Sequence, residues 1–95
     1  MRKYEIMYIV NASLEDDKRQ EVIENLHGII TNNGGQVVNV DDWGMRSFAY
    51  PIDHMLKGYY MVIKIEAENN AINEFDRLTR INSNVVRHMI INLED

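Results

Sequence analysis

Apolar and polar residues alternate through positions 2–10, a period of two that is typical of a strand with one buried face. One side of this strand carries Tyr4, Ile6, Tyr8 and Val10, and the other carries Lys3, Glu5, Met7 and Ile9. Because the first set has no charged member, we expect it to face the core and the second set to face away from it.

The next segment repeats apolar residues at helical spacing, and this pattern predicts a helix over residues 14–32. The apolar stripe of this helix consists of Val22, Ile23, Leu26, Ile29 and Ile30. Ser13 is the predicted N-cap, because a serine oxygen can accept from a free amide of the first turn, and Asp16 suits a capping box. Asn33 precedes two glycines that favour left-handed geometry, so the helix is expected to stop there.

Aromatic and β-branched residues dominate positions 36–52 and 57–65, which predicts two long strands joined by a turn. Pro51 has no amide donor, so the first of these strands is expected at a sheet edge and the second in the sheet interior. Two aspartates shortly before Gly44 predict a bulge or a strong twist in the edge strand before Arg46. The predicted core side of the interior strand carries Tyr59, Met61, Ile63 and Ile65, and its other side carries Tyr60, Val62, Lys64 and Glu66.

A second helix is predicted from about Asn69 and Asn70, which can serve as caps, to about Ile81. Its apolar side consists of Ala71, Ile72, Phe75 and Leu78. Residues 82–84 predict a turn, and residues 85–93 are rich in β-branched residues and predict the last strand. Adjacent apolar pairs interrupt the alternation in this strand, so the pattern leaves its inward face open.

The predicted order is strand, helix, strand, strand, helix, strand. Two right-handed crossovers then give an α+β, ferredoxin-like βαββαβ fold, with a four-stranded antiparallel sheet and both helices on one face. The other face is expected to be uncovered, with an apolar centre and the charged residues Lys3, Lys64 and Glu66 at its rim. An exposed apolar patch often marks a docking surface, so the predicted partner-binding residues are Met7, Ile9, Tyr60 and Val62.

The two long strands contain a recognisable motif. The sequence reads Gly44-x-Arg46-x-Phe48-Ala49-Tyr50-x-Ile52, preceded by Trp43 and followed by Lys57-Gly58-Tyr59. This motif resembles the signature of the family of the sixth protein of the bacterial small ribosomal subunit. Phe48 stands where the family usually has leucine, and Asp53 stands where it has a basic or small polar residue. The Met-Arg-x-Tyr-Glu opening and the Arg-His-Met segment near the end also fit.

The resemblance implies a structural, non-enzymatic protein of the small (30S) ribosomal subunit in the cytoplasm. It implies binding to small-subunit ribosomal RNA together with the eighteenth protein of that subunit, a small basic chain. It implies neither a cofactor nor a small-molecule substrate.

Composition agrees with a small domain that works beside a partner. Ninety-five residues suffice for one core, so a single domain over residues 1–95 is expected. The absence of cysteine fits a reducing cytoplasm, and neither a signal peptide nor an apolar run of the ~20 residues that cross a bilayer occurs, so we expect a soluble protein. The formal net charge of -5 argues against binding nucleic acid alone, because Lys and Arg supply most non-specific affinity.

Five cations are candidates for contact with RNA phosphates, because guanidinium and ammonium groups pair with phosphate oxygens. They are Arg2, Lys3, Arg46, Lys57 and Arg87. Composition alone favours an ordinary solvated surface for these residues. The resemblance favours RNA, since the corresponding cations of the family lie toward ribosomal RNA.

Other chemistry is not indicated. The segment 57–64 partly matches the strand that stacks bases in RNA-recognition motifs, but the matching phase would bury Lys64, so Tyr59 and Met61 are expected inside instead. His27, His54 and His88 lack metal-ligand spacing, and no serine lies in a nucleophile-elbow sequence.

Two other function classes fit the same fold. The main alternative is a ferredoxin-like regulatory or ligand-binding module that pairs its open sheet with a second copy. An acylphosphatase-like enzyme is disfavoured, because no Gly-rich loop with Arg and Asn follows the first strand.

Overall fold

The computed structural model describes residues 1–52 and 55–93, and His54 and Asp53 lie outside this range. The elements in chain order are β1 (Arg2–Asn11), α1 (Asp16–Asn32), β2 (Gln36–Ile52), β3 (Met55–Ala67), α2 (Asn69–Ile81) and β4 (Val85–Asn92). No helix of the described residues is long and apolar enough to span a membrane.

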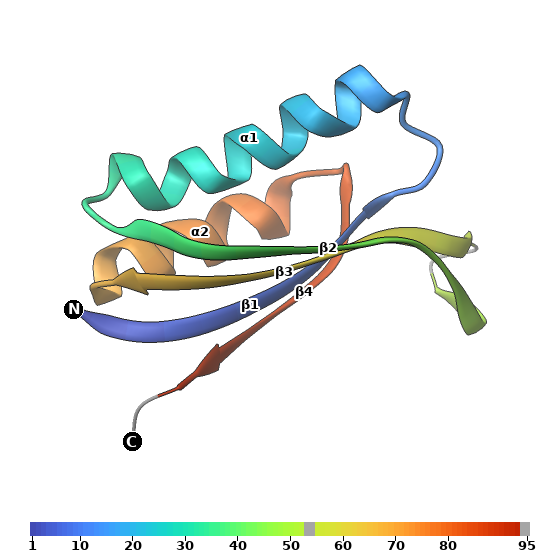
Figure 1. Ribbon diagram of the computed structural model, residues 1–95. Coiled ribbons are helices and arrows are strands. Elements are labelled where there is room, and N and C mark those ends of the chain that lie inside the picture. The colour runs from blue at the N-terminus through green and yellow to red at the C-terminus, as the bar shows by residue number, and fades with distance from the viewer. Residues whose placement is uncertain (53–54, 94–95) are drawn as a thin grey trace.

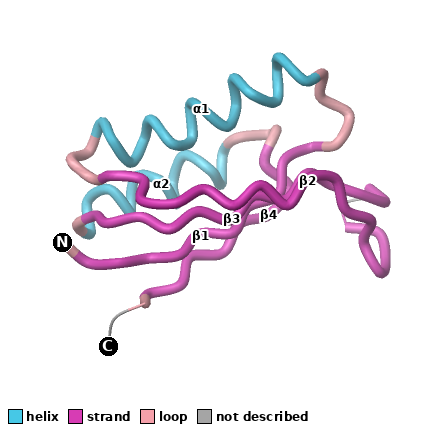
Figure 2. Tube along the Cα trace, in the orientation of Figure 1, coloured by secondary structure: helices cyan, strands magenta, loops and turns pink. Residues whose placement is uncertain are grey.

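The sheet has four strands in the order β2-β3-β1-β4, and each neighbouring pair is antiparallel. The predicted ferredoxin-like fold is confirmed, including the long edge strand β2 and the interior strands β1 and β3. Both helices cover the same face of the sheet (Figure 1). We call this side the helix face and the other side the open face. Figure 2 shows that the end of β2 and the start of β3 extend beyond the two helices.

The core lies between the sheet and the two helices. The predicted inward residues of β1 are all buried, as are Met61, Ile63 and Ile65 of β3. These strands meet in register, with Ile6 opposite Ile63, and α1 and α2 contribute Leu26, Ile30 and Phe75 to the same cluster. On β4, His88 and Ile90 lie opposite Tyr8 and Ile6, which assigns them to the helix face.

The predicted start of α1 is wrong. The helix begins at Asp16, its N-cap position is Glu15, and no side chain caps it. The backbone amide and hydroxyl of Ser13 both donate instead to Oδ1 of Asn11, at 2.9 and 2.8 Å. The end of β1 therefore holds the serine in the preceding turn, where it cannot serve the first turn of the helix.

The predicted caps of α2 are also wrong, because Glu68 occupies the N-cap position and makes no side-chain cap hydrogen bond. The two asparagines make tertiary contacts instead. Oδ1 of Asn69 accepts from the Tyr4 hydroxyl at 3.3 Å, and the amide of Asn70 donates to the Asn33 carbonyl at 3.3 Å. These bonds tie the helix start to β1 and to the end of α1.

The glycines after α1 stop the helix as predicted. Gly34 has a φ of 84°, and its amide donates to the Thr31 carbonyl, while the Gly35 amide donates to the Ile30 carbonyl at 2.9 Å. This pair of bonds is a Schellman motif. Gly35 then passes so close to β3 that a Cβ atom there would lie 3.0 Å from the Glu66 carbonyl oxygen.

Two glycine substitutions should change stability in opposite directions. Gly35→Ala should lower the free energy of unfolding by about 1–3 kcal/mol, because the added methyl group has no room against β3. The same change at Gly28, where nothing lies within 4 Å of the built Cβ, should raise it by about 0.5–1 kcal/mol through helix propensity. Urea unfolding measures both, and equal effects at the two sites would contradict the close approach of Gly35.

A buried polar pair links β1 to α1. The Tyr8 hydroxyl lies 2.8 Å from Nε2 of His27, and the two rings meet edge to face with centroids 6.1 Å apart. Burial is the main cause that raises the pKa of Tyr8, with smaller contributions from the charge of Asp42 and from Tyr59. Burial also lowers the pKa of His27. The pair is therefore held neutral in the folded protein.

Stability should consequently fall in mild acid. The pKa of His27 is lower in the folded than in the unfolded protein, so the stabilisation is complete above about pH 6.5 and is lost as the pH falls through the folded-state value. We expect the free energy of unfolding to decrease from pH 7.5 to 5, and to decrease less in His27→Gln. An identical pH dependence in the two proteins would contradict a lowered pKa of His27.

Candidate partner and RNA-binding surface

The open face gathers the four predicted partner-binding residues into one patch. Met7 lies opposite Val62, and Ile9 lies opposite Tyr60, in adjacent cross-strand pairs of β1 and β3. Side chains directly opposite each other in an antiparallel pair share a face and touch. The predicted alternation therefore placed these four residues correctly, side by side at the centre of the sheet.

The expected exposure of this centre is wrong for two of the four residues. Ile9 and Val62 are only 4% and 9% exposed, whereas Met7 and Tyr60 are half-buried. The reason lies partly in Phe48, since a Cβ built on Gly58 would lie 2.4 Å from Cγ2 of Ile9 and 2.9 Å from Cζ of Phe48. Side chains of the sheet itself thus cover part of the face that lacks helices.

Three ring-bearing residues form what we call the aromatic cluster, namely Trp43, Phe48 and Tyr60. The Trp43 and Tyr60 rings stack with centroids 6.4 Å apart and an interplanar angle of 10°, and Phe48 meets Tyr60 edge-on at 6.0 Å. Trp43 remains 43% exposed. The cluster therefore exposes part of its aromatic surface to solvent. Aromatic residues are enriched in protein interfaces.

A bulge places Trp43 in this cluster. The pairing of β2 with β3 shifts between Asp42 and Gly44, and Gly44 has a φ of 76°, which a side chain would disfavour. The bulge predicted from the sequence is confirmed. Trp43 turns toward the open face, where its indole N–H donates to Oδ2 of Asp41 at 3.0 Å.

Two of the five candidate cations lie on the same face as the aromatic cluster. Arg46 lies opposite Gly58 and places its guanidinium carbon 5.8 Å from the centroid of the Trp43 ring, while its Nε donates to the Trp43 carbonyl at 3.2 Å. Arg87 of β4 lies opposite Ile9, and therefore on the open face as well. Both arginines are exposed.

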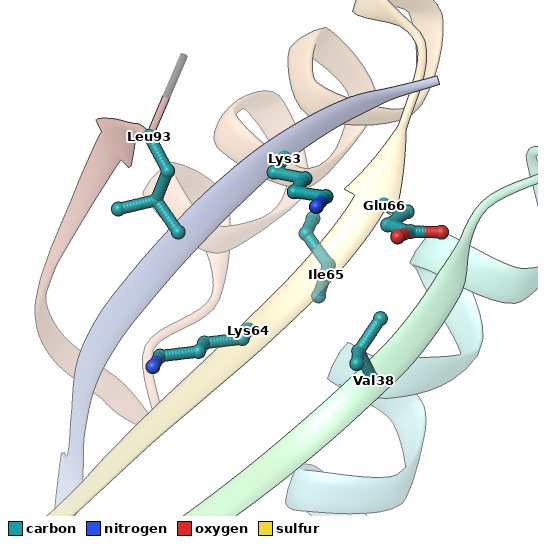
Figure 3. Close-up of a pocket in the computed structure, with 6 residues that line it drawn as sticks. All are labelled: Lys3, Val38, Lys64, Ile65, Glu66 and Leu93. Atoms are coloured by element: carbon teal, nitrogen blue, oxygen red, sulfur yellow. The ribbon is translucent and has the colours of Figure 1, made fainter.

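Lys3 lies at the opposite end of the open face, across from Glu66. It lines a shallow hollow of about 310 Å³ together with Lys64, Val38 and Leu93. Figure 3 shows Lys64 extending from β3 toward β1 in this hollow. The sequence predicts Lys64 at the charged rim of the open face, and the structure adds that Lys64 lines this hollow.

The remaining two candidate cations lie elsewhere. Arg2 lies opposite Ala67, which is buried on the helix face. Lys57 lies opposite Ser47. Because its neighbour Gly58 is on the open face, Lys57 belongs to the other side of the strand. Lys57 instead lines a hollow with Asn11, the last residue of β1, and with residues 12 and 13 of the loop before α1. The structure therefore divides the five cations between the two sides of the sheet.

An apolar stripe on β4 was missed by the sequence interpretation. Met89 and Ile91 are 49% and 43% exposed, and they lie opposite Met7 and Glu5 on the open face. The interrupted alternation of this strand left its two sides unassigned. Because β4 is an edge strand, the stripe extends the patch centred on Met7 to the border of the sheet.

The described residues hold no group of three or more His, Asp or Glu side chains suited to a metal ion. His88 bonds Oδ1 of Asp76 at 2.8 Å, and this bond is the main cause that lowers the pKa of Asp76, with Arg80 adding to it. His27 is bonded to Tyr8 instead. Each of these two histidines thus joins a strand to a helix.

The helices cover one side of the sheet, and the other side presents aromatic and cationic residues, which defines a small ferredoxin-like protein with one open sheet face. Residues 3–92 match the family model described as Ribosomal protein S6, and the chain belongs to that family. Its fold is similar to the crystal structure of 30S ribosomal protein S6 from Thermotoga maritima, with a TM-score of 0.91 and 27% sequence identity over 96% of this chain and 86% of that chain. The resemblance in the motif is confirmed, and the protein is a component of the 30S subunit of the cytoplasmic ribosome.

Gly58 is the position where the open-face packing is most easily tested. Gly58→Ala should lower the free energy of unfolding by about 1–3 kcal/mol, because the new methyl group must displace Ile9 and Phe48. It should also change the fluorescence of Trp43, which belongs to the same cluster. A variant with native stability and emission would show that Phe48 does not pack over this strand.

Proposed function

We propose that this protein binds small-subunit ribosomal RNA jointly with a basic partner, the eighteenth protein of that subunit, and acts there as a structural and not a catalytic component. The observation that carries the proposal is the open face, where the partly exposed aromatic cluster shares the sheet surface with Arg46 and Arg87. Such a surface offers apolar area to a protein and positive charge to RNA at the same place.

The partner would dock on the centre and border of the open face. Met7, Ile9, Tyr60 and Val62 form the centre, and Met89 and Ile91 extend it along β4. Acidic Asp41 lies beside the cluster, opposite Val62, and a net charge of -5 attracts a basic chain over longer distances. A basic partner would also reduce the repulsion between this acidic protein and RNA.

The pairing of charges supports the choice of RNA-binding residues. Arg19, Arg77 and Arg80 on the helices each pair with an acid on the same helix. Within the described part of the chain, Arg2, Lys3, Lys57 and Arg87 form no ion pair. An unpaired cation can contact a phosphate oxygen without first breaking an ion pair, so we propose these four and Arg46 as RNA contacts.

The homodimeric module remains a second candidate because of the apolar stripe on β4. Exposed Met89 and Ile91 on an edge strand fit a second copy of the chain as well as a foreign partner. Sedimentation of the purified protein distinguishes the two: a stable homodimer that does not change when the basic partner is added would favour the module.

The decisive test of the proposed function is a titration of small-subunit ribosomal RNA with this protein, with and without the basic partner, at several salt concentrations. We expect weak binding alone, tight binding by the pair, and a steeper dependence of log K on log salt for the pair. Tight binding to arbitrary RNA without the partner would contradict the proposal.

Charge reversal at Arg46 should separate binding from folding. Arg46→Glu should weaken RNA binding by the pair about tenfold and flatten its salt dependence, since a phosphate or partner contact is lost and a repulsion is added. The free energy of unfolding should change by about 0.5 kcal/mol or less, because the side chain is exposed.

Arg77→Glu is the matched control for this variant. It makes the same change in net charge at an exposed site on α2, where the arginine pairs with Glu74 of its own helix and with no other acid among residues 1–52 and 55–93. Its RNA affinity should stay within about twofold of the wild type. Equal losses in both variants would mean that net charge, and not the position of Arg46, determines the affinity.

A further inference from the structure

The carboxylate of Asp42 holds two donors at the bulge in β2. Its Oδ2 accepts from the Tyr59 hydroxyl at 2.6 Å, and its Oδ1 accepts from the backbone amide of Gly44 at 2.9 Å. Asp42 lies opposite Met61, on the helix face, so both bonds form on the side of the sheet away from the aromatic cluster. One side chain therefore joins the two ends of the bulge to the neighbouring strand β3.

Tyr59 is in turn held by the first helix. The guanidinium carbon of Arg19 lies 4.2 Å from the centroid of the Tyr59 ring, and the same guanidinium donates to Oδ1 of Asp16 at 2.7 Å. The hydrogen bond to Asp42 is the main cause that raises the pKa of Tyr59, and Arg19 opposes it. The first turn of α1 is thus connected to β2 through Arg19, Tyr59 and Asp42.

Trp43 lies between the two bonded residues of the bulge. Its neighbours Asp42 and Gly44 are fixed to each other by the carboxylate–amide bond, and Gly44 has the left-handed φ that turns the chain. The bonds that fix the bulge on either side of Trp43 therefore lie on the opposite side of the sheet from the Tyr60 ring, on which Trp43 stacks.

We propose that Asp42 and Tyr59 are positioning residues, which lock the bulge from the helix face and thereby aim Trp43 into the surface that receives the basic partner. The effect on partner binding rests on the proposed function, whereas the effect on Trp43 does not. Both residues act through the backbone at Gly44 and the indole of Trp43. The bond between Asp42 and Tyr59 is solvent-exposed, and a hydrogen bond of this kind contributes little to global stability.

Two variants test the lock at different points. Tyr59→Phe keeps the ring under Arg19 and removes only the hydroxyl, and Asp42→Asn weakens both bonds without changing the size of the side chain. Their matched controls are Tyr50→Phe, which removes an exposed hydroxyl, and Asp17→Asn, which removes an exposed carboxylate on α1.

Three measurements are made on each protein. Hydrogen exchange at the Gly44 amide reports the bond to Asp42, and iodide quenching of the fluorescence reports the packing of Trp43, the single tryptophan of the chain. The third is the affinity of the protein for the basic partner. We expect Asp42→Asn to speed Gly44 exchange about tenfold or more, and both variants to raise the quenching and weaken partner binding about five- to tenfold.

Thermal melting separates positioning from a loss of structure. The melting temperatures of both variants should stay within a few degrees of the wild type, and the two controls should match it in all measurements. Native quenching in Asp42→Asn and Tyr59→Phe would overturn the proposal, as would binding losses that merely follow the loss of global stability. A wild-type protein that does not bind the partner would refute the proposed function, while exchange and quenching would still decide on the lock.

Discussion

The structure depends on burying apolar side chains from both faces of two interior strands. β1 and β3 carry apolar residues on each side, yet the helices cover only one side. On that side, Leu26, Ile30 and Phe75 complete the core in the usual way, by burying an apolar stripe against the sheet. On the other side, side chains of β2 supply part of the cover, and what they leave open becomes the surface available to other molecules.

The long edge strand therefore has two tasks. Along its first residues it pairs with β3 at the side of the sheet, and from its middle onward it supplies Trp43 and Phe48 to the open face. In a regular strand, Trp43 would follow Asp42 without an extra residue, and the side chains after it would keep the alternation of the first half of β2. The shift at Asp42 and Gly44 changes that alternation, because one extra residue re-aims the side chains that follow.

The fold was predictable from sequence because its signals are periodic and local. The alternation in β1 and β3 assigned both faces, and the two glycines after α1 marked its end. The helix caps were predicted wrongly because Ser13 and Asn69 had competing partners, Asn11 and Tyr4, one of which is distant in sequence. The burial of Ile9 was missed for the same reason. It depends on Phe48 of β2, which is distant in sequence and packs against Gly58 of β3 beside Ile9. The motif identified the family. The assignment of the five cations to the helix face or the open face required the strand register seen in the structure.

The irregular pairing at the sheet borders has a consequence for the protein before assembly. The pairing of β2 with β3 changes register at three places, between Val37 and Asn39, between Asp42 and Gly44, and between Ser47 and Ile52. The pairing of β4 with β1 changes register between Ile9 and Val10. A newly made subunit with straight, uninterrupted borders would offer a template for endless strand addition by its copies. Irregular borders make that template less regular, which disfavours the repeated edge-to-edge addition of free copies.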